Sequence, residues 1–343
     1  MTKTYYSTFI PGLLEPVRDA LLTDLPQSRI VNALDGLILY ESSAPIDVIR
    51  RLPFVTNTFY VLKIFTGDRA MTVGSMASNI LRDRVLGCSL PFPYKQNTTF
   101  RVVVSQGGEL VAIKNDLMGQ MEAWIRTRTG LILNRSKPDI QFWLLQRTEG
   151  YGFFSVRITK HKAYDKILQK GELRPELANI LCQLSEPVPN ELFLDPFCGS
   201  GAIPIQRAKC FPRGLVIASD KDQRIVNSLK DRVKKLDLRR RIVVRCNDAL
   251  HLTRYGDGSI HKIVTDPPWG HFVNVEMPLD IFYREMISEF IRVLRSKGRL
   301  VMLTAQTGVI DEIIEHCTEL TLLKKFNILL SGRKASIYIL VRN

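Results

Sequence analysis

The fold of this chain is indicated first by the segment Leu192–Pro204, with the sequence LFLDPFCGSGAIP. It predicts a short buried strand that ends at Asp195 and leads through a turn with Gly199 and Gly201 into a helix. Such a turn lies where an open α/β sheet binds its ligand. The next apolar run ends in Asp220, and an acidic residue at the tip of a second strand suits a ribose with free hydroxyls. A ligand that carries a ribose is therefore expected at this edge of a parallel sheet.

Two ligands fit this arrangement, a dinucleotide and S-adenosylmethionine (SAM). The dinucleotide fingerprint needs a third glycine, and this chain has Pro204 at that position, so a diphosphate site is disfavoured. A glycine turn that binds nothing is the structural alternative in any doubly wound fold. What favours SAM over that alternative is a second motif, which begins 71 residues after Asp195.

The second motif is DPPW at residues 266–269, directly after the β-prone run Ile263–Thr265. Two prolines end the strand and fix a rigid, extended loop on the same rim as the two earlier aspartates. The carboxylate of Asp266 and the carbonyl of Pro267 then form two acceptors, which suit the two hydrogens of an exocyclic amino group. Trp269 offers an aromatic face for a base taken out of its stack. A proline turn with a packed tryptophan is the structural alternative, and the pairing of the two motifs disfavours it.

Together the two motifs resemble those of class I SAM-dependent methyltransferases that modify exocyclic amino nitrogens of bases. The segment Gly171–Ala178 resembles the part of that fold that closes over the methionine end of the cofactor, and Asn247–Ala249 resembles the turn that meets the adenine. The resemblance implies a catalytic loop made of Asp266, Pro267, Pro268 and Trp269, and no metal ion. It implies as cofactor-binding residues Arg174, Pro175, Asp195, Pro196, Phe197, Gly199, Gly201, Asp220, Lys221, Asp248, Ala249 and Asp266.

The end of the chain resembles a narrower group, the THUMP-containing guanosine methyltransferases of RNA. Residues 331–335, SGRKA, ahead of the predicted strand Ser336–Val341 resemble the final hairpin of that group. The resemblance to a methyltransferase covers residues 157–343, about half of the chain.

The first half of the chain predicts two further modules. Its first 65 residues read strand, helix, strand, strand, helix, strand, with a hairpin turn at Asp35-Gly36, which is the split βαβ order of a ferredoxin-like unit. A helix-rich stretch, Arg101 in a strand, a helix over 116–129 and a Pro-Asp turn then resemble a THUMP RNA-binding module.

The fold class implied is α/β. We expect a C-terminal Rossmann-like class I methyltransferase, seven-stranded with the last strand antiparallel, and an N-terminal α+β ferredoxin-like plus THUMP module. The expected boundaries are a ferredoxin-like domain at 1–70, a THUMP domain at 71–158, a linker at 159–175 and the methyltransferase domain at 176–343. Within the last domain a helix over 281–294 is expected to stop at Gly298.

The formal net charge of +14 indicates a polyanionic partner, and nucleic acid is the commonest one. A basic surface kept for solubility is the alternative. The candidates for phosphate contact in the predicted THUMP module, each of them individually more often a solvated surface charge, are Arg82, Arg84, Arg126, Arg128, Arg135 and Lys137.

Cysteine usage and hydropathy indicate a cytoplasmic protein. The six cysteines lack C-x-x-C spacing, which favours reduced thiols over a zinc site or a disulfide framework. No apolar run reaches the ~18 residues that span a bilayer. The first residues of the chain lack the pattern of a signal peptide.

The family resemblance implies methyl transfer from SAM to the exocyclic 2-amino group of a guanosine in tRNA. The DPPW tetrapeptide, with Trp269 where the tRNA enzymes tend to have Tyr or Phe, also resembles the corresponding motif of adenine 6-amino methyltransferases of RNA or DNA. An alternative from another class is a non-catalytic protein that binds structured RNA, which the intact motifs disfavour. The sequence leaves open which nucleotide is modified, whether one or two methyl groups are added, and whether a small activating subunit is required.

Overall fold

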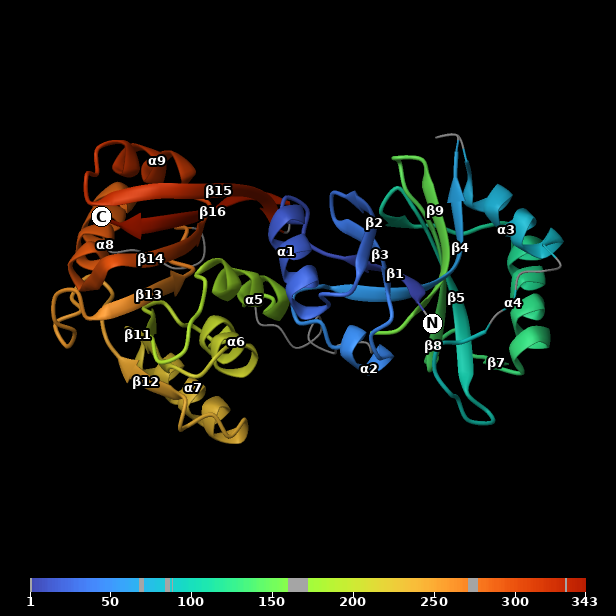
Figure 1. Cartoon of the computed structure of the whole chain (residues 1–343), viewed down its shortest axis with the longest axis horizontal. Helices are drawn as coiled ribbons and strands as arrows, with labels where there is room; N and C mark the ends of the chain where they lie inside the picture. The colour runs from blue at the N-terminus through green and yellow to red at the C-terminus, as the bar shows by residue number, and fades with distance from the viewer. Residues whose placement is uncertain are drawn as a thin grey trace. The chain divides into compact units, whose positions relative to one another are not determined.

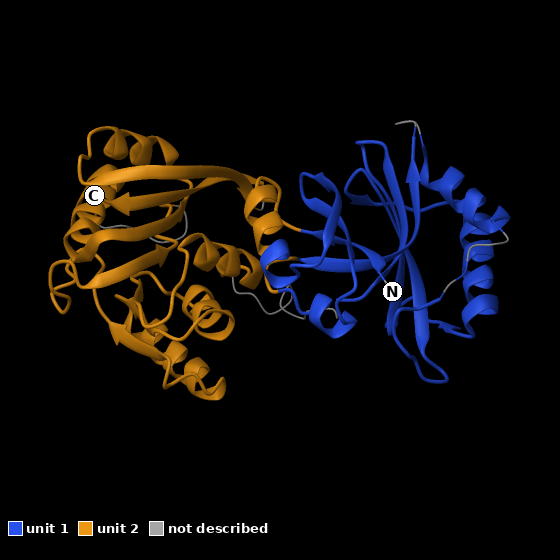
Figure 2. Ribbon diagram, in the orientation of Figure 1, with its two compact units in different colours: residues 1–8, 21–52, 56–162 blue, residues 9–20, 53–55, 163–343 orange. Residues whose placement is uncertain are grey.

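The computed structural model describes residues 2–67, 71–83, 87, 89–159, 172–270, 277–330 and 332–343 (Figure 1). Arg84, Gly171, Ser331 and most of the predicted linker 159–175 lie outside the described residues. The chain divides into two compact units (Figure 2). Unit 1 comprises Met1–Thr8, Leu21–Leu52 and Thr56–Lys162, and unit 2 comprises Phe9–Ala20, Pro53–Val55 and Ala163–Asn343.

Unit 1 is built on a nine-stranded sheet with the order β2-β3-β1-β4-β9-β8-β5-β6, in which β7 also pairs with β5. The strands are β1 Lys3–Thr8, β2 Arg29–Leu34, β3 Leu37–Ser42, β4 Asn57–Thr66, β5 Thr99–Gln106, β6 Glu109–Leu110, β7 Ile132–Leu133, β8 Ile140–Gln146 and β9 Tyr151–Arg157. The helices are α2 Ile46–Ile49, α3 Val73–Arg82 and α4 Asn115–Thr129, together with the end of α1 Leu14–Asp24.

Local sequence signals explain much of this sheet. The predicted hairpin at Asp35-Gly36 is confirmed, because Leu34 pairs with Leu37 and Gly36 takes the left-handed φ of +81° that the turn requires. Helix α4 ends at Gly130, whose φ of +70° closes the last turn, as predicted. The pairing of β4 with β9 joins the early and late strands into one sheet, and no local pattern signals it.

Two apolar clusters among the described residues pack against the sheet of unit 1. One lies between the sheet and helices α3 and α4, which contribute Met76, Ile80 and Met121 against Phe100 and Phe142. The other includes Tyr6, Phe59 and Phe153. The ring centroid of Tyr6 lies 4.6 Å from that of Phe59 and 4.8 Å from that of Phe153. Buried aromatic side chains in both clusters therefore stabilise this unit.

Unit 2 is built on a seven-stranded sheet with the order β12-β11-β10-β13-β14-β16-β15. The strands are β10 Leu192–Asp195, β11 Leu215–Asp220, β12 Ile242–Cys246, β13 Ile260–Thr265, β14 Leu294–Thr304, β15 Leu320–Leu330 and β16 Arg333–Arg342. The first five strands of this order run parallel, and β16 pairs antiparallel with both β14 and β15. A parallel sheet of this kind needs helices on both faces.

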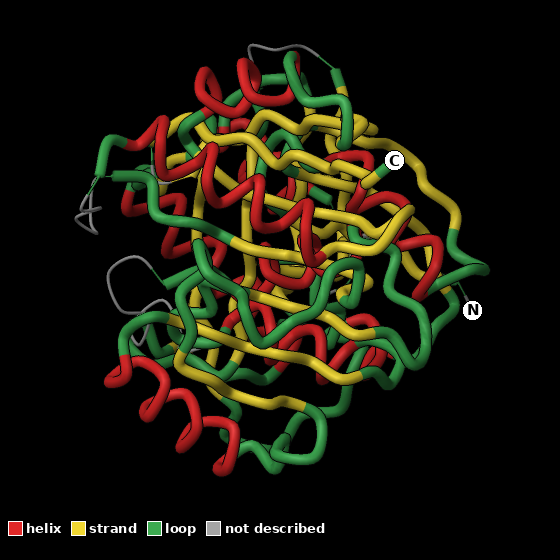
Figure 3. Tube along the Cα trace, turned by 90° about the vertical axis from the view of Figure 1, so that its left-hand side faces the viewer, coloured by secondary structure: helices red, strands yellow, loops and turns green. Residues whose placement is uncertain are grey.

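Helices flank the strands of this sheet (Figures 1 and 3). They are α5 Pro175–Leu184, α6 Ala202–Cys210, α7 Gln223–Lys235, α8 Leu279–Val293 and α9 Thr307–Glu315. Helices α8 and α9 share one apolar cluster with β10, β13, β14 and β16, in which Phe290, Tyr283 and Ile310 are fully buried. Helix α6 packs on β10 to β12, α7 on β11 and β12, and α5 on α6. The α/β layering that the sequence predicts is confirmed.

The predicted helix stop at Gly298 is wrong. Helix α8 ends at Val293, and β14 begins at once with Leu294. Residues 295–298 form a bulge, since Leu294 pairs with Ile260 while Arg299 pairs with Lys262. A Cβ at Gly298 would lie 2.7 Å from the carbonyl oxygen of Arg295, so the glycine serves a close backbone approach. Among the described residues, no helix has the length and apolarity that crossing a membrane demands.

Candidate active site

The two sequence motifs meet at the switch point of the unit 2 sheet. Strand β10 pairs in parallel with β11 on one side and with β13 on the other. Asp195 ends β10, Asp220 ends β11, and Asp266 follows the last residue of β13. The carboxyl ends of adjacent parallel strands share one rim, where open α/β sheets bind ligands. The predicted convergence of the three aspartates is therefore confirmed.

Asp195 is the most buried of the three, with 1% of its surface exposed. Its Oδ1 accepts hydrogen bonds from the Thr265 hydroxyl at 2.9 Å and from the Phe197 amide at 3.2 Å. Burial raises the pKa of Asp195 to about 8, and the nearby charges of Asp266 and Asp220 act in the same direction. A buried carboxylate of this kind would gain most from a cationic ligand group.

The glycine turn connects Asp195 to Asp220. The Gly199 amide donates to Oδ2 of Asp220 at 3.2 Å, and burial raises the pKa of Asp220 above its ordinary value. Gly201 begins α6 with φ +89°, and a Cβ there would lie 2.3 Å from Cδ1 of Leu229. Gly199 has φ +47°, and a Cβ there would meet no atom within 4 Å. The turn thus packs tightly at Gly201 and faces open space at Gly199.

The predicted adenine turn lies on the same rim. The Asn247 amide donates to the carbonyl of Asp220 at 3.1 Å, and Asp248 accepts from the Leu250 amide at 3.0 Å. Asp248 and Lys221 are exposed, while Ala249 is buried with 3% of its surface accessible. The side-chain amide nitrogen of Asn247 is buried and has no partner among the described residues, which is unusual for a polar group away from a ligand.

The segment ahead of α5 is tied to the glycine turn by a residue that the sequence did not single out. Arg232 of α7 donates both to Glu172, at 2.8 Å, and to the carbonyl of Ser200, at 2.9 Å. Arg174 is exposed at the N-terminal cap of α5 without a capping hydrogen bond, and Pro175 occupies the first turn. Of the remaining predicted cofactor residues, Pro196 is buried, and Phe197 packs on Phe282 at a ring-centroid distance of 5.9 Å.

The DPPW loop contains a carboxylate with an unusual pKa. Oδ1 of Asp266 accepts a hydrogen bond from the Trp269 indole nitrogen at 2.9 Å. Burial raises the pKa of Asp266 to about 7, although the bond from Trp269 lowers it in part. The contacts of the described residues include none to Oδ2 of Asp266 and none to the Pro267 carbonyl. Both acceptors predicted to receive an amino group therefore keep unused capacity.

Two residues outside the motif hold the carbonyls of Pro268 and Trp269. The hydroxyl of Tyr283, on α8, donates to the Pro268 carbonyl at 3.0 Å and lies 2.8 Å from the Thr304 hydroxyl. The side-chain amide of Gln306 donates to the Trp269 carbonyl at 2.7 Å. Sequence reasoning missed Tyr283 and Gln306 because each lies far along the chain in an ordinary amphipathic or loop context. Neither residue contacts the Pro267 carbonyl, which has no protein partner among the described residues.

The predicted phosphate contacts of unit 1 are partly engaged within the protein. Arg135 forms a paired hydrogen bond with Glu122 at 2.6 and 2.9 Å, and the guanidinium of Arg128 stacks 4.5 Å above the Trp124 ring. The remaining described candidates, which lie on the surface, are Arg82, Arg126 and Lys137.

The residues present on the unit 2 rim fit a nucleoside cofactor. The open space at Gly199, the unpartnered Asn247 amide and the carboxylates of Asp195 and Asp220 offer a bare backbone, a donor and acceptors along one rim of the sheet. In the described parts of the chain, no three His, Cys, Asp or Glu side chains converge as a metal site requires.

Comparison with known proteins identifies the family. The family described as RMKL-like, methyltransferase domain, matches residues 162–335, just over half of the chain. The tRNA (guanine(6)-N2)-methyltransferase of Thermus thermophilus is 25% identical over 231 residues, which cover 66% of this chain and 68% of the relative. The protein of the same name from Methanocaldococcus jannaschii is 22% identical over 98% of this chain and 99% of its own length.

Solved structures share the fold. TrmN from Thermus thermophilus superposes with a TM-score of 0.80 at 20% identity, covering 100% of both chains. SMU.472, crystallised in complex with SAH, superposes with a TM-score of 0.73 at 15% identity, covering 100% of this chain and 98% of its own. The matched sequence family, the switch-point rim and the shared fold agree, and the chain belongs to the family of RMKL-like methyltransferase domains.

Proposed function

We propose that this chain transfers a methyl group from SAM to the exocyclic 2-amino group of a guanosine in tRNA. The cofactor assignment is supported by the rim described above and by the SAH bound to a structural neighbour. The substrate assignment is supported by the relatives from Thermus thermophilus and Methanocaldococcus jannaschii, both named tRNA (guanine(6)-N2)-methyltransferase.

The observation that carries the proposal is the acceptor pair on the DPPW loop. A base amino group is a poor nucleophile because its lone pair is delocalised into the ring. Oδ2 of Asp266 and the Pro267 carbonyl are two acceptors without a partner among the described residues, so each would accept one amino hydrogen. This arrangement favours a more tetrahedral nitrogen and directs its lone pair away from the ring. Alignment of this kind supplies much of the acceleration in transfer between bound reactants.

The remaining residues hold this pair in place. Tyr283 holds the carbonyl of Pro268, and Gln306 holds the carbonyl of Trp269. These bonds restrain the backbone that follows Pro267. Trp269 would present its ring to the base, and its indole nitrogen orients Asp266. Asp195, Asp220 and the glycine turn would hold the cofactor, which supplies an activated methyl group when bound.

The pKa of about 7 gives Asp266 a second role. The carboxylate must be ionised to accept a hydrogen bond on both oxygens, and this form predominates above pH ~7. After transfer the amino nitrogen carries a surplus proton, which leaves to Asp266 or to water. A carboxylate with this pKa can take up a proton and release it again at neutral pH.

Unit 1 is proposed to bind the tRNA. The strand order β2-β3-β1-β4 supports a ferredoxin-like domain over 1–70, and the helices and strands that follow support a THUMP domain over 71–158. We propose that a linker over 159–175 and a methyltransferase domain over 176–343 follow these two domains. The basic character of the chain, with a net charge of +14, suits a phosphate backbone.

The test is incubation of the protein with labelled SAM and unmodified total tRNA, followed by nucleoside analysis by mass spectrometry. We expect N2-methylguanosine with the wild type and none with Asp266→Ala. Methyladenosine would replace the proposal with the adenine 6-amino alternative. Retained binding of structured RNA, without transfer or SAH binding, would support a non-catalytic RNA-binding protein.

A further inference from the structure

The connection between β12 and β13 lacks a helix. Parallel strands are usually joined by a helical crossover, which satisfies its own backbone hydrogen bonds. Residues 247–259 are all described, and they contain only turns between Cys246 and Ile260. Short turns within the crossover satisfy some of its backbone groups, such as the amides of His251, Tyr255 and Ser259, and the other groups need partners from elsewhere. This crossover matters to the site because it begins with Asp248 and Ala249, the predicted adenine turn.

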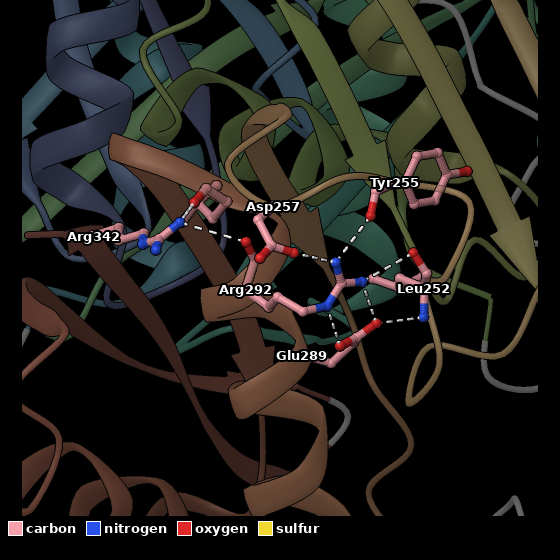
Figure 4. Close-up of polar contacts among 7 residues, drawn as sticks. Leu252, Tyr255, Asp257, Glu289, Arg292 and Arg342 are labelled. Atoms are coloured by element: carbon pink, nitrogen blue, oxygen red, sulfur yellow. Dashed lines mark hydrogen bonds and ion pairs between the residues drawn. The ribbon is translucent and has the colours of Figure 1, made fainter.

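Arg292 supplies several of those partners (Figure 4). From the last turn of α8, it donates to the carbonyls of Tyr255 at 3.0 Å and Leu252 at 3.1 Å, and to the carboxylate of Asp257 at 2.7 Å. One guanidinium therefore holds three points of the crossover. A planar fork with five donors suits this geometry, whereas a lysine ammonium has a single nitrogen.

Glu289 completes the contact from one turn earlier on the same helix. It accepts hydrogen bonds from Arg292 at 2.7 and 2.8 Å and from the Leu252 amide at 2.6 Å (Figure 4). Both backbone groups of Leu252 are thus held by α8, and the Leu252 side chain is fully buried. The bonds from Arg292 lower the pKa of Glu289, so the carboxylate stays ionised.

The helix that carries this pair is itself anchored. Phe290 and Val293 of α8 are fully buried in the main cluster of unit 2. Arg342, the last residue of β16, donates to the carbonyls of Arg292 and Leu294 at the C-terminal end of α8 (Figure 4). The guanidinium of Arg292 therefore extends from a rigid support.

The restraint reaches the adenine turn through short steps. The Leu250 amide donates to the Asp248 side chain, and the His251 amide donates to the Asp248 carbonyl at 3.1 Å. Leu252 follows directly and is held by Glu289 and Arg292. A displacement of Leu252 would shift the peptide that carries Asp248 and Ala249.

We propose that Arg292 is a positioning residue for cofactor binding: it replaces the missing crossover helix and holds the turn of Asp248 and Ala249 against the adenine. The inference rests on the proposed function, since it assumes that this turn meets the cofactor. It assigns a role to a residue that touches neither cofactor nor base. Loss of the fork would weaken cofactor binding and leave tRNA binding intact.

The test compares Arg292→Lys with the wild type, because lysine keeps the charge but cannot reach three acceptors at once. We expect the Kd for SAH, measured by calorimetry, to rise on the order of tenfold. Hydrogen exchange of the free protein should accelerate over residues 250–257. The Kd for tRNA should stay within twofold of the wild type.

Two controls separate positioning from general destabilisation. Arg284 lies on the same helix as Arg292 and forms an exposed ion pair with Glu312 of α9, so Arg284→Lys should leave SAH affinity and exchange unchanged. Glu191→Gln weakens a buried pair with Arg207, so it should lower the melting temperature without weakening SAH binding. A separate comparison concerns the partner of Arg292: Glu289→Gln keeps an oxygen acceptor for the Leu252 amide and should bind SAH more tightly than Glu289→Ala.

Unchanged SAH affinity in Arg292→Lys would overturn the inference while leaving the proposed function in place. Equal weakening in Arg292→Lys and Glu191→Gln at equal loss of stability would also overturn it, because stability alone would then account for the effect. Failure of the wild type to bind SAH would overturn the proposed function, and the inference with it.

Discussion

Replacing Gly201 with alanine is expected to destabilise unit 2 through two separate effects. The backbone at this position has φ +89° and ψ 22°, a left-handed conformation that costs a residue with a Cβ about 1–2 kcal/mol. The new Cβ would also lie 2.3 Å from Cδ1 of Leu229, a side chain that is 1% exposed. Leu229 would have to move within a packed core, and overpacking of this kind costs about 1–3 kcal/mol.

Together the two effects should lower the free energy of unfolding by about 2–5 kcal/mol. For a domain of roughly 150–250 residues, each kcal/mol lowers the melting temperature by roughly 2–4 °C. A loss of about 3 kcal/mol therefore corresponds to a decrease of roughly 6–12 °C.

Gly199→Ala is the matched variant in the same turn. Its φ of +47° carries the backbone cost alone, about 1–2 kcal/mol, because the added Cβ meets no protein atom within 4 Å. That Cβ would instead extend into the open space beside the turn, where we propose that the cofactor binds. We expect Gly199→Ala to lose less stability than Gly201→Ala, and to lose SAH affinity on the order of tenfold.

Thermal unfolding and calorimetric SAH binding measure the two effects on each variant. Equal destabilisation by the two substitutions would refute the clash with Leu229. Wild-type SAH affinity in Gly199→Ala would refute the assignment of the open space beside this turn to the cofactor.

Three further predictions concern residues around the site. Tyr283→Phe keeps the buried ring but removes the hydrogen bonds to Pro268 and Thr304, so single-turnover methyl transfer should slow on the order of tenfold at unchanged SAH affinity; an unchanged rate would contradict the bracing role. Glu191→Ala leaves Arg207, which has no exposed surface, as an unpaired buried cation, and denaturant unfolding should show a loss of about 3–5 kcal/mol; a loss below about 1 kcal/mol would contradict it. Asp195 has a pKa of about 8 in the folded protein, above its ordinary 3.8, so the folded state holds the extra proton between these values and its contribution to stability is lost as the pH rises through about 8. Asp195→Asn should therefore reduce the fall in the unfolding free energy of the free protein over that range, and an identical slope would contradict the burial argument.

The rim of the site could be predicted from the sequence because it follows from local signals. Asp195 and Asp220 end apolar strands and Asp266 directly follows one, and parallel strands bring such positions to one edge. The glycines and prolines that shape the turns act within a few residues of where they stand. These features need no knowledge of distant contacts.

The parts that support the rim could not be predicted in this way. Tyr283 reaches the DPPW loop from α8 and Gln306 from the N-cap of α9, and their sequence surroundings indicate only a helix face and a loop. Arg292 lies in an ordinary amphipathic helix, and its role depends on the absence of a helix elsewhere. The wrong prediction of a helix stop at Gly298 has the same origin. A glycine that follows a helical pattern predicts the end of the helix, and the sequence alone does not distinguish this from a glycine in a β-bulge.

The continuous sheet of unit 1 could not be predicted from local sequence signals either. Strand β4 pairs with β9, with Phe59 opposite Arg157, so the contact joins segments almost a hundred residues apart. Strand propensity predicts that each segment is extended and says nothing about its partner. Register over such separations depends on packing of the whole sheet.

The most direct test of the central claim is the pH dependence of single-turnover methyl transfer to tRNA, from about pH 5 to about pH 9, in the wild type and in Asp266→Asn. Since Asp266 has a pKa of about 7, the wild-type rate should rise through that pH and then level off. At saturating SAM, Asp266→Asn should be slower on the order of a hundredfold and should lack this rise. A variant rate within threefold of the wild type, with the same rise near pH ~7, would contradict the role assigned to Asp266.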